Sequence, residues 1–359
     1  MVLCRTIASA GLFLVCGGCG GRDVTSADPV ATPPASPAQR TARASDRLSV
    51  GGKSCVVRAG GVVTCWTDHP VDVADVPAAV QVAVGAGHQC ALTTTGTVWC
   101  WGIIVRANIE FLIGSELPSR ILGLSGVVQI AAGDFHSCAL LASGRVQCWG
   151  AGDEGQLGNG ESSDQLSPVP VEGLEDAVEI SAGGGFTCAR RASNAVACWG
   201  DIFRGEPGDL SLRSVPGTVV GVEDAVQITA GAAHACARRS NGSAVCWGKY
   251  YSGALRPEAT GATDATELSA GYDATCALRP EGTVDCWGPN QFVLGDSTVP
   301  NQVAGLTNII TVGVGSVHAC AVRSDGAAFC WGYNGSGILG NGSTEPVVGL
   351  VQVVGLQAL

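Results

Sequence analysis

The feature that most constrains this chain is a set of regularly paired cysteines. Fourteen of its 17 cysteines form seven pairs, and the two members of every pair are ten residues apart. The pairs are Cys55 with Cys65, Cys90 with Cys100, Cys138 with Cys148, Cys188 with Cys198, Cys236 with Cys246, Cys276 with Cys286, and Cys320 with Cys330. Successive first cysteines lie 35, 48, 50, 48, 40 and 44 residues apart, which is a period typical of four-stranded propeller blades. The sequence therefore predicts an all-β chain that folds as a seven-bladed β-propeller.

Each pair predicts a β-hairpin with a short turn. If the two cysteines face each other across antiparallel strands, the turn falls four to six residues after the first cysteine. The last residue of such a three-residue loop commonly adopts the left-handed conformation, which glycine tolerates best and asparagine next. That position is glycine in six repeats and Asn194 in the fourth. The same count makes the cysteines a non-hydrogen-bonded pair, whose side chains lie closest. We therefore expect one cross-strand disulfide in each blade.

Zinc binding is the alternative use of paired cysteines near histidines. Four histidines stand two residues before a first cysteine: His88, His136, His234 and His318. Zinc sites usually space their thiolates by two to four residues. The other three repeats carry Lys53, Phe186 and Ala274 where these four have histidine. We therefore predict no metal and no cofactor, and we expect these histidines to make a structural hydrogen bond at the start of a strand.

Composition and charge narrow the class of protein. The chain is 46% hydrophobic and 14% charged, and its 52 glycines and 16 prolines lie among short apolar runs. Such punctuation favours many short strands joined by tight turns. The 31 acidic residues outnumber the 20 basic ones, which argues against a nucleic-acid partner.

The N-terminus predicts export from a bacterial-type cell. Arg5 precedes an apolar stretch at residues 7–15, which is too short to span a bilayer, so residues 1–18 are interpreted as a signal peptide. Two glycines stand directly before Cys19, an arrangement that resembles the lipobox of bacterial lipoproteins, in which this cysteine is lipidated. Cys16 stands where those proteins usually have leucine, so plain secretion is the alternative.

The segment that follows predicts a tether. Residues 19–47 are rich in proline, alanine, serine and threonine and carry almost no large apolar side chain, which is typical of a disordered linker. Residues 48–359 are left for the propeller. We expect the protein either to be held at the cell envelope by a lipid on Cys19, its one contact with a membrane, or to be secreted.

The repeat unit resembles that of a known family. From Ile130 the third repeat reads Ile-Ala-Ala-Gly-Asp-Phe-His-Ser-Cys-Ala-Leu, followed by Gly-Arg-Val-Gln-Cys-Trp-Gly from Gly144 and Gly-Gln-Leu-Gly at residues 155–158. This ordered set is similar to the repeats of the regulator of chromosome condensation family, which form seven-bladed propellers. The last motif recurs as Gly-Ile-Leu-Gly at residues 337–340 and decays in other repeats. The resemblance extends from about Leu48 to the C-terminus.

The two ends of the chain predict how the ring closes. Residues 168–180 precede an internal repeat, and the C-terminal residues 351–359 correspond to the first half of that stretch. Residues 48–50 correspond to its second half. We therefore expect N- and C-terminal strands to complete one blade together, which would leave no long open sheet edge.

The resemblance implies little about activity. The founding eukaryotic member of the family is a guanine-nucleotide exchange factor for a small nuclear GTPase. We do not expect that activity here, because only fold-building residues match and an exported, acidic, disulfide-bonded protein would not meet such a partner. Some secreted bacterial members bind or inhibit other proteins. We predict a monomeric, non-enzymatic scaffold that binds an unknown protein or surface ligand.

The predicted contact surface is the set of irregular loops between hairpins, because loops carry recognition on rigid scaffolds. These loops are residues 102–120, 151–168, 201–216, 249–260 and 289–300. Aromatic residues are favoured anchors, and those that the repeat does not require are Phe111, Phe203, Tyr250, Tyr251, Phe292 and Tyr333. Packing over the propeller rim is the alternative role for these rings.

A second hypothesis is a carbohydrate-active hydrolase or lyase in the central channel. Such chemistry needs convergent carboxylates or a nucleophile with its base. Those residues should break the repeat pattern inside the ring, and the sequence shows no clustered departure of that kind. No catalytic residue is therefore assigned.

Overall fold

A computed structural model describes residues 43–102, 104–106, 109–111, 117–201, 213–248, 253–289, 293 and 297–356. Every described residue belongs to one compact unit, Ser36–Leu359. The predicted signal peptide and Cys19 lie outside the described residues.

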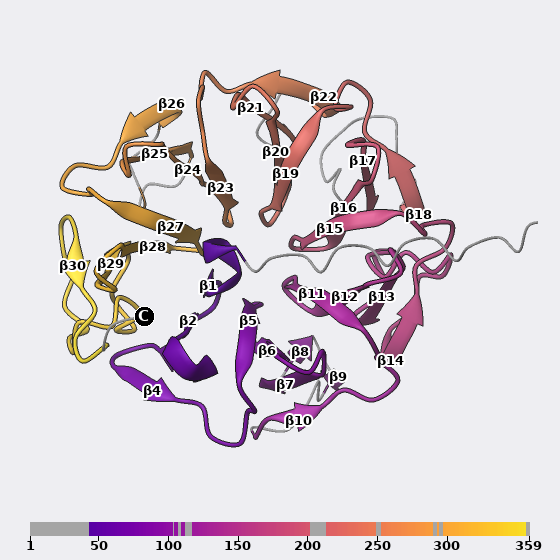
Figure 1. Ribbon diagram of the computed structural model, residues 1–359, viewed down its shortest axis with the longest axis horizontal. Helices are drawn as coiled ribbons and strands as arrows, with labels where there is room; N and C mark the ends of the chain where they lie inside the picture. The colour runs from indigo at the N-terminus through magenta and orange to yellow at the C-terminus, as the bar shows by residue number, and fades with distance from the viewer. Residues whose placement is uncertain are drawn as a thin grey trace, which may run out of the picture. The chain divides into compact units, whose positions relative to one another are not determined.

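The described unit is built of seven four-stranded antiparallel sheets placed around a central axis (Figure 1). Blade 1 contains β1 (Leu48–Val50), β2 (Ser54–Val57), β3 (Val63–Trp66) and β4 (Pro70–Asp72). Blade 2 contains β5 (Ala79–Val84), β6 (His88–Thr93), β7 (Val98–Gly102) and β10 (Ser119–Arg120), and its loop carries the separate hairpin β8 (Ile104–Arg106) and β9 (Ile109–Phe111). Blade 3 contains β11 (Val127–Ala132), β12 (His136–Leu141), β13 (Val146–Gly150) and β14 (Gln165–Pro170).

The remaining blades repeat this order. Blade 4 contains β15 (Ala177–Ala182), β16 (Phe186–Arg191), β17 (Val196–Gly200) and β18 (Arg213–Thr218). Blade 5 contains β19 (Ala225–Ala230), β20 (His234–Arg239), β21 (Ala244–Gly248) and β22 (Gly253–Ala259). Blade 6 contains β23 (Glu267–Ala270), β24 (Thr275–Leu278), β25 (Val284–Gly288) and β26 (Ser297–Gln302). Blade 7 contains β27 (Ile309–Val314), β28 (His318–Arg323), β29 (Ala328–Gly332) and β30 (Val351–Gln352). The predicted all-β, seven-bladed propeller is confirmed.

Two short 3-10 turns complete the secondary structure of the described residues. They are η1 (Ala44–Asp46), directly before β1, and η2 (Ala59–Gly61), in the hairpin of blade 1. η1 lies within the segment predicted to be a tether.

The predicted hairpin geometry is confirmed in every blade. Each first cysteine lies directly opposite the second across the two middle strands. All seven pairs are joined by disulfides, with Cα–Cα distances of 4.0 to 4.1 Å. From blade 1 to blade 7 the bonds join Cys55 to Cys65, Cys90 to Cys100, Cys138 to Cys148, Cys188 to Cys198, Cys236 to Cys246, Cys276 to Cys286, and Cys320 to Cys330. The turn residue six after the first cysteine has positive φ in each repeat, including Asn194 at 67°.

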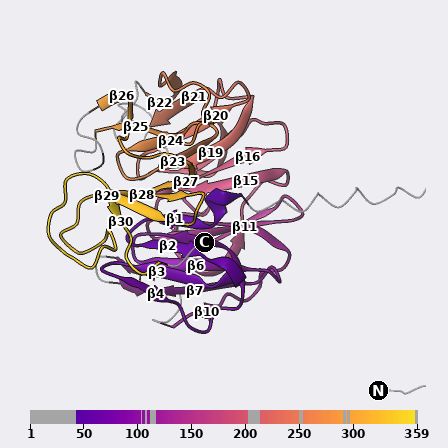
Figure 2. The ribbon, with the colours of Figure 1, turned by 60° about the vertical axis from the view of Figure 1, so that its left-hand side comes forward.

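The predicted closure of the ring by one mixed blade is wrong. All four strands of blade 1 come from the N-terminal part of the chain, and β30 pairs with β29 inside blade 7. The stretch at residues 168–180 is divided between two blades, because β14 is the outer strand of one blade and β15 is the inner strand of the next. The first and last described strands, β1 and β30, consequently lie in neighbouring blades, and Figures 1 and 2 both show the yellow blade 7 beside the indigo blade 1.

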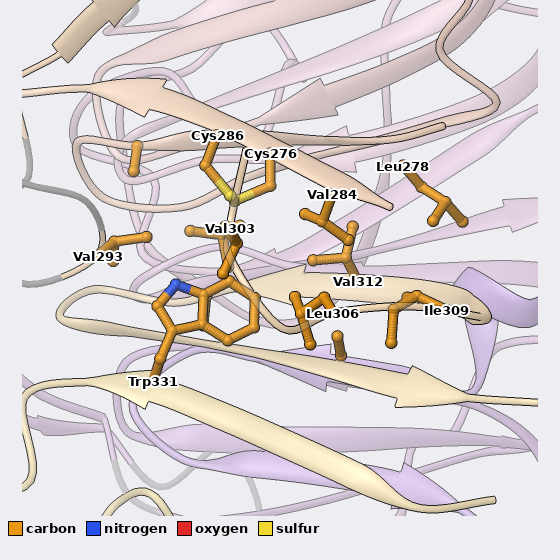
Figure 3. Close-up of a cluster of buried hydrophobic side chains, with 14 residues drawn as sticks. Cys276, Leu278, Val284, Cys286, Val293, Val303, Leu306, Ile309, Val312 and Trp331 are labelled. Atoms are coloured by element: carbon orange, nitrogen blue, oxygen red, sulfur yellow. A yellow bond between two sulfur atoms is a disulfide. The ribbon is translucent and has the colours of Figure 1, made fainter. Parts of the chain in front are cut away.

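The hydrophobic core is distributed between the blades. Trp331 of blade 7 packs in one buried cluster with Cys276 and Cys286 of blade 6, together with apolar side chains such as Val303 and Val312 (Figure 3). The tryptophan after every second cysteine makes the same kind of contact with the disulfide of the preceding blade. This includes Trp66 of blade 1, which lies against the disulfide of blade 7. The ring therefore closes through the contact that joins its internal blades.

Candidate functional site

The histidines before the first cysteines tie neighbouring blades together. The ring Nε2 of His136 lies 2.8 Å from Thr187 Oγ1 of the next blade. Thr187 Oγ1 also lies 3.0 Å from the backbone oxygen of Gln156, to which it donates, so it accepts from the histidine. The other three pairs, at 2.7 to 2.8 Å, are His88 with Ser137, His234 with Thr275, and His318 with Ser54. The predicted structural hydrogen bond at the start of a strand is confirmed, and its partner lies in the following blade.

Burial keeps these four histidines neutral. Their exclusion from water lowers the pKa of His136 to about 3 and the pKa values of His88, His234 and His318 to about 4. A neutral imidazole that is hydrogen-bonded to a hydroxyl inside an interface between blades is suited to a structural role. Among the residues that the structure describes, no group of three or more His, Cys, Asp or Glu side chains could hold a metal ion.

The hydrogen bond between blades has a sequence signal, which is visible only when each repeat is compared with the next one. The residue directly before the first cysteine of the next blade is Ser or Thr wherever a blade has the histidine. Where the histidine is replaced by Lys53, Phe186 or Ala274, the following blade has Gln89, Ala235 or Ala319. Histidine and hydroxyl thus occur together or not at all.

The ends of the propeller differ in their connections. At one end lie the turns between first and second strands, exemplified by residues 133–135, and the connections from third to fourth strands; we call it the loop face. At the other end lie the two-cysteine hairpin turns, exemplified by residues 142–144; we call it the hairpin face. An axial channel opens at both, as a cavity of about 250 Å³ at the loop face and one of about 190 Å³ toward the hairpin face. Both cavities are lined by the same ring of small apolar side chains at the ends of the inner strands: Val50, Val84, Ala132, Ala182, Ala230, Ala270 and Val314.

Near the hairpin face, buried polar side chains form hydrogen bonds between the inner strands of neighbouring blades. Gln129 on β11 donates its Nε2–H to the backbone oxygen of Ile180 on β15 and accepts from the backbone N–H of the same residue, both at 3.0 Å. Gln81 and Gln227 make the same double bond to the inner strand of the next blade. This position, nine residues before the first cysteine, is polar in all seven repeats: Asp46, Gln81, Gln129, Glu179, Gln227, Glu267 and Thr311.

The two glutamates in this ring are both engaged. Glu179 is 3% exposed, and its carboxylate pairs with Arg190 at 2.9 Å and with Arg43 at 2.7 Å. Arg43 directly precedes η1, and its side chain reaches Glu179 of blade 4, a residue that lines the hairpin-face cavity. Glu267 Oε1 accepts from the backbone N–H of Val312 at 3.1 Å and from the Thr311 hydroxyl at 2.8 Å. Burial raises the pKa of Glu267 to about 7.

Backbone turns form the rim of the loop-face mouth. Six backbone N–H groups donate to carbonyl oxygens of the next blade at 3.0 to 3.3 Å, and the donors are Gly52, Ala86, Asp134, Gly184, Ala232 and Tyr272. The glycine just before each of these turns has no room for a side chain. A Cβ on Gly133 would stand 2.3 Å from the backbone oxygen of Gly183 and equally close to the His136 ring. The repeated Ala-Gly motif therefore lets the turns close into a ring.

Three side chains break the repeat at this mouth. The same turn position holds glycine or alanine in four blades, but Asp134 in blade 3, Tyr272 in blade 6 and Ser316 in blade 7. Tyr272 is 50% exposed, and Asp134 is half-buried. Burial raises the pKa of the Asp134 carboxyl. Sequence analysis missed this clustered departure, because the three residues are far apart in the chain and meet only when the ring closes.

Of the aromatic residues predicted to form the contact surface, the structure places one side chain. Tyr333 is 45% exposed, and its backbone N–H donates to the carbonyl of Val317, so it lies at the loop face. Phe111 lies in β9, where only the backbone is described. Phe203, Tyr250, Tyr251 and Phe292 lie outside the described residues.

Part of one predicted contact loop packs against a neighbouring blade. In the Gly-Gln-Leu-Gly motif of blade 3, the backbone oxygen of Gln156 accepts from the indole N–H of Trp199 at 2.9 Å. A Cβ on Gly158 would stand 2.6 Å from that indole nitrogen. A Cβ on Gly340 would stand 2.6 Å from Cδ1 of Trp66, across the junction of blades 7 and 1. The motif therefore covers the tryptophan of the following blade.

The described unit is thus a seven-bladed propeller of disulfide-stapled blades with an open axial mouth on its loop face. Models of the regulator of chromosome condensation (RCC1) repeat match residues 79–103, 127–156, 225–253, 265–292 and 309–338, and a second model of this repeat matches residues 143–190. The chain belongs to this repeat family. No curated protein sequence matches it. Among the described residues, no helix is long and apolar enough to cross a membrane.

Solved structures share the fold. Prp20p from Saccharomyces cerevisiae, described with its binding to Gsp1p and histones, is 21% identical with a TM-score of 0.67, and the match covers 80% of both chains. Yeast RCC1 (Prp20) bound to Kap60 is 17% identical with a TM-score of 0.70, covering 93% of this chain and 91% of that one. The ectodomain of the receptor kinase CR4 from Physcomitrella patens is 25% identical with a TM-score of 0.54, covering 80% of this chain and 72% of that one.

Proposed function

We propose that this protein is an exported, non-enzymatic scaffold that binds another protein or a surface ligand through its loop face. The observation that carries the proposal is where the repeat is broken. Residues that build the blades recur around the ring, whereas Asp134, Tyr272, Ser316 and Tyr333 do not, and all four lie at the loop face. Solved relatives that bind Gsp1p, histones and Kap60 give the fold a precedent in protein recognition.

Export is supported by the disulfides. Seven cross-strand bonds form and persist in an oxidising compartment outside the cytosol. We propose that residues 1–18 are a signal peptide, that Cys19 carries the lipid, and that the segment after it is a tether.

The recognition surface can be tested by affinity capture with matched baits. The oxidised wild-type protein should retain a specific partner from an envelope or culture extract, and a Tyr272→Ala, Tyr333→Ala bait should lose it. The Tyr250→Ala, Tyr251→Ala bait tests the predicted contact loop at residues 249–260. The Tyr272→Ala, Tyr333→Ala variant should melt near the wild-type temperature, because both rings are about half exposed and contribute little to the core. We expect the same of the Tyr250→Ala, Tyr251→Ala variant if those rings serve recognition. A partner retained equally by all three baits would refute the choice of face, and a melting temperature many degrees lower would assign the rings to packing.

The anchor has an independent test. Mass spectrometry of protein from a native-type host should find a diacyl or triacyl adduct on Cys19, and Cys19→Ser should release the protein into the medium. An unmodified soluble wild-type chain would leave plain secretion as the answer.

A carbohydrate-active enzyme is not favoured by the described channel. Glu179 pairs with two arginines, and Glu267 is held by backbone and hydroxyl donors, so neither carboxylate is presented to a substrate. Asp134 supplies one carboxyl at the opposite mouth, whereas glycoside hydrolysis uses two that flank the scissile bond. We likewise do not propose nucleotide exchange, since the likeness to Prp20p shows the fold alone.

A further inference from the structure

We infer that the loop-face mouth receives one basic side chain, a lysine or an arginine, of the partner protein. This inference rests on the proposed function and specifies what the binding face recognises. It follows from the hydrogen-bonding groups that the mouth offers, the charge of its lining, its size, and a basic side chain that pairs with a buried carboxylate at the opposite cavity.

The rim of the mouth offers hydrogen-bond acceptors. Six backbone N–H groups of the turns already donate to the next blade. The glycine N–H groups that precede them, such as those of Gly85 and Gly133, donate at 2.8 to 2.9 Å to a carbonyl within their own blade. Backbone carbonyl oxygens can each accept a second hydrogen bond. An anion would find these donors occupied, whereas a cation finds an acceptor-rich ring.

Asp134 gives the mouth a negative charge. Its carboxylate is half-buried, and none of the arginines and lysines that the structure describes pairs with it. Burial without a cation disfavours the charged carboxylate, which is why the pKa of Asp134 is raised. An incoming ammonium or guanidinium group would offset that cost and stabilise the ionised form.

Tyr272 adds an aromatic surface to the same cavity. Its side chain lines the mouth and is half exposed, so a ring is accessible at a position where most blades have glycine or alanine. A cation next to an aromatic face is attracted by the negative face of the ring. An acidic group and an aromatic ring in one concave site together favour a basic side chain over a neutral one.

The size of the cavity limits the ligand. Pockets that enclose drug-sized molecules measure about 300 to 1,000 Å³, and this mouth measures about 250 Å³. It can admit one extended side chain, while the surrounding loop face carries further contacts through residues such as Tyr333.

The hairpin-face mouth shows the same chemistry within the chain. There Arg43 enters the axial region and its Nη1 lies 2.7 Å from the buried Glu179 carboxylate. The loop-face mouth has a carboxylate and no such arginine from the described chain. A basic residue of the partner would pair with Asp134 at the loop face, as Arg43 pairs with Glu179 near the hairpin face.

The inference can be tested without knowing the partner. Nα-acetyl-lysine amide and Nα-acetyl-arginine amide should each shift the amide NMR resonances of Gly133, Asp134 and Tyr272 in the oxidised full-length protein, and Nα-acetyl-norleucine amide should not. Asp134→Ala should weaken the binding at least about tenfold. This variant should fold, because Ala86 and Ala232 occupy the same position in other blades. Glu281→Gln removes one negative charge at an exposed hairpin turn and is the matched control, which should bind like wild type.

Equal shifts from the norleucine probe, no shifts at the mouth, or binding unchanged in Asp134→Ala would overturn the inference. Binding of butylammonium with no response to either capped amino acid would also overturn it and indicate a small organic cation. These results are separable from the affinity capture. A partner that a single Tyr333→Ala bait loses while the probes fail refutes the mouth alone, because Tyr333 does not line the cavity. Mouth binding with no face-dependent partner refutes the proposed function alone.

Discussion

Replacing Glu267 by glutamine should stabilise the protein at alkaline pH. In the equivalent position, Gln129 both donates to and accepts from Ile180 of the next inner strand. Glu267 accepts from the Val312 N–H in the same way, but an ionised carboxylate has no proton to donate. The substitution therefore installs in blade 6 the side chain that already joins the blades elsewhere in the ring.

The magnitude follows from the pKa of Glu267. Burial raises it from 4.5 to about 7, and the nearby Asp46 adds to the effect while Arg43 opposes it. One pKa unit corresponds to about 1.4 kcal/mol, so ionising the folded protein costs on the order of 3 kcal/mol. Because the folded pKa lies above the unfolded one, the stability that the protonated form provides is complete below pH 4.5 and is lost as pH rises through 7. Glu267→Gln should recover it, with a gain of up to about 3 kcal/mol at pH 8 and little change at pH 4.

Urea unfolding of the oxidised protein, followed by tryptophan fluorescence, measures this difference. Glu179→Gln is the matched control, because it makes the same change at the same position of blade 4. There it should destabilise at pH 8, since it leaves Arg190 and Arg43 without the buried carboxylate with which both pair. A Glu267→Gln variant that is destabilised at pH 8, or changed equally at both pH values, would refute the reasoning.

Three further perturbations test the contacts between blades. Thr187→Ala leaves the buried His136 without its hydrogen-bond partner and should lower the free energy of unfolding by about 1 to 3 kcal/mol. The His136→Phe, Thr187→Ala double variant copies the natural pair Phe186 and Ala235 and should cost less than the sum of the two single changes. Additive costs in this double-mutant cycle would contradict the hydrogen bond between the blades. Trp149→Ala removes a buried aromatic ring that packs against the disulfide of blade 2, and urea unfolding should show a loss of stability of about 3 to 5 kcal/mol. A loss below about 1 kcal/mol would show that the ring is not needed there. The four inter-blade histidines have folded pKa values of about 3 to 4 and an unfolded value of 6.5, so the stability they contribute is present above pH 6.5 and is lost as pH falls toward 4. The double variant removes one of the four and should reduce the dependence of the unfolding free energy on pH in this range by about a quarter. An unchanged pH dependence would count against buried neutral histidines.

Relations within one hairpin could be predicted from the sequence. A separation of ten residues and a glycine or Asn194 at the turn determine which residues face each other, because a tight turn sets the register of its two strands. The disulfides, the hairpins and the number of blades follow from that local geometry. Counting the repeats also predicted the propeller, since seven such units stack around one axis.

Relations between blades required the tertiary structure. Residues 168–180 look like one continuous stretch, yet the boundary between two blades falls inside it, and this is why the predicted closure was wrong. The bond from His318 to Ser54 joins residues 264 positions apart, and only the closed ring makes them neighbours. A weak sequence signal for these ties existed, because each histidine is matched by a hydroxyl in the next repeat.

The candidate site depends on the fold in the same way. Asp134, Tyr272 and Ser316 are ordinary turn residues when each repeat is considered alone. They share one cavity because every inner strand ends at the same mouth of the channel, so that residues from blades 3, 6 and 7 meet at the axis. Local spacing thus determined what each blade is, and the closing of the ring decided which side chains meet, because contacts around an axis depend on where whole blades pack and not on the separation of residues along the chain.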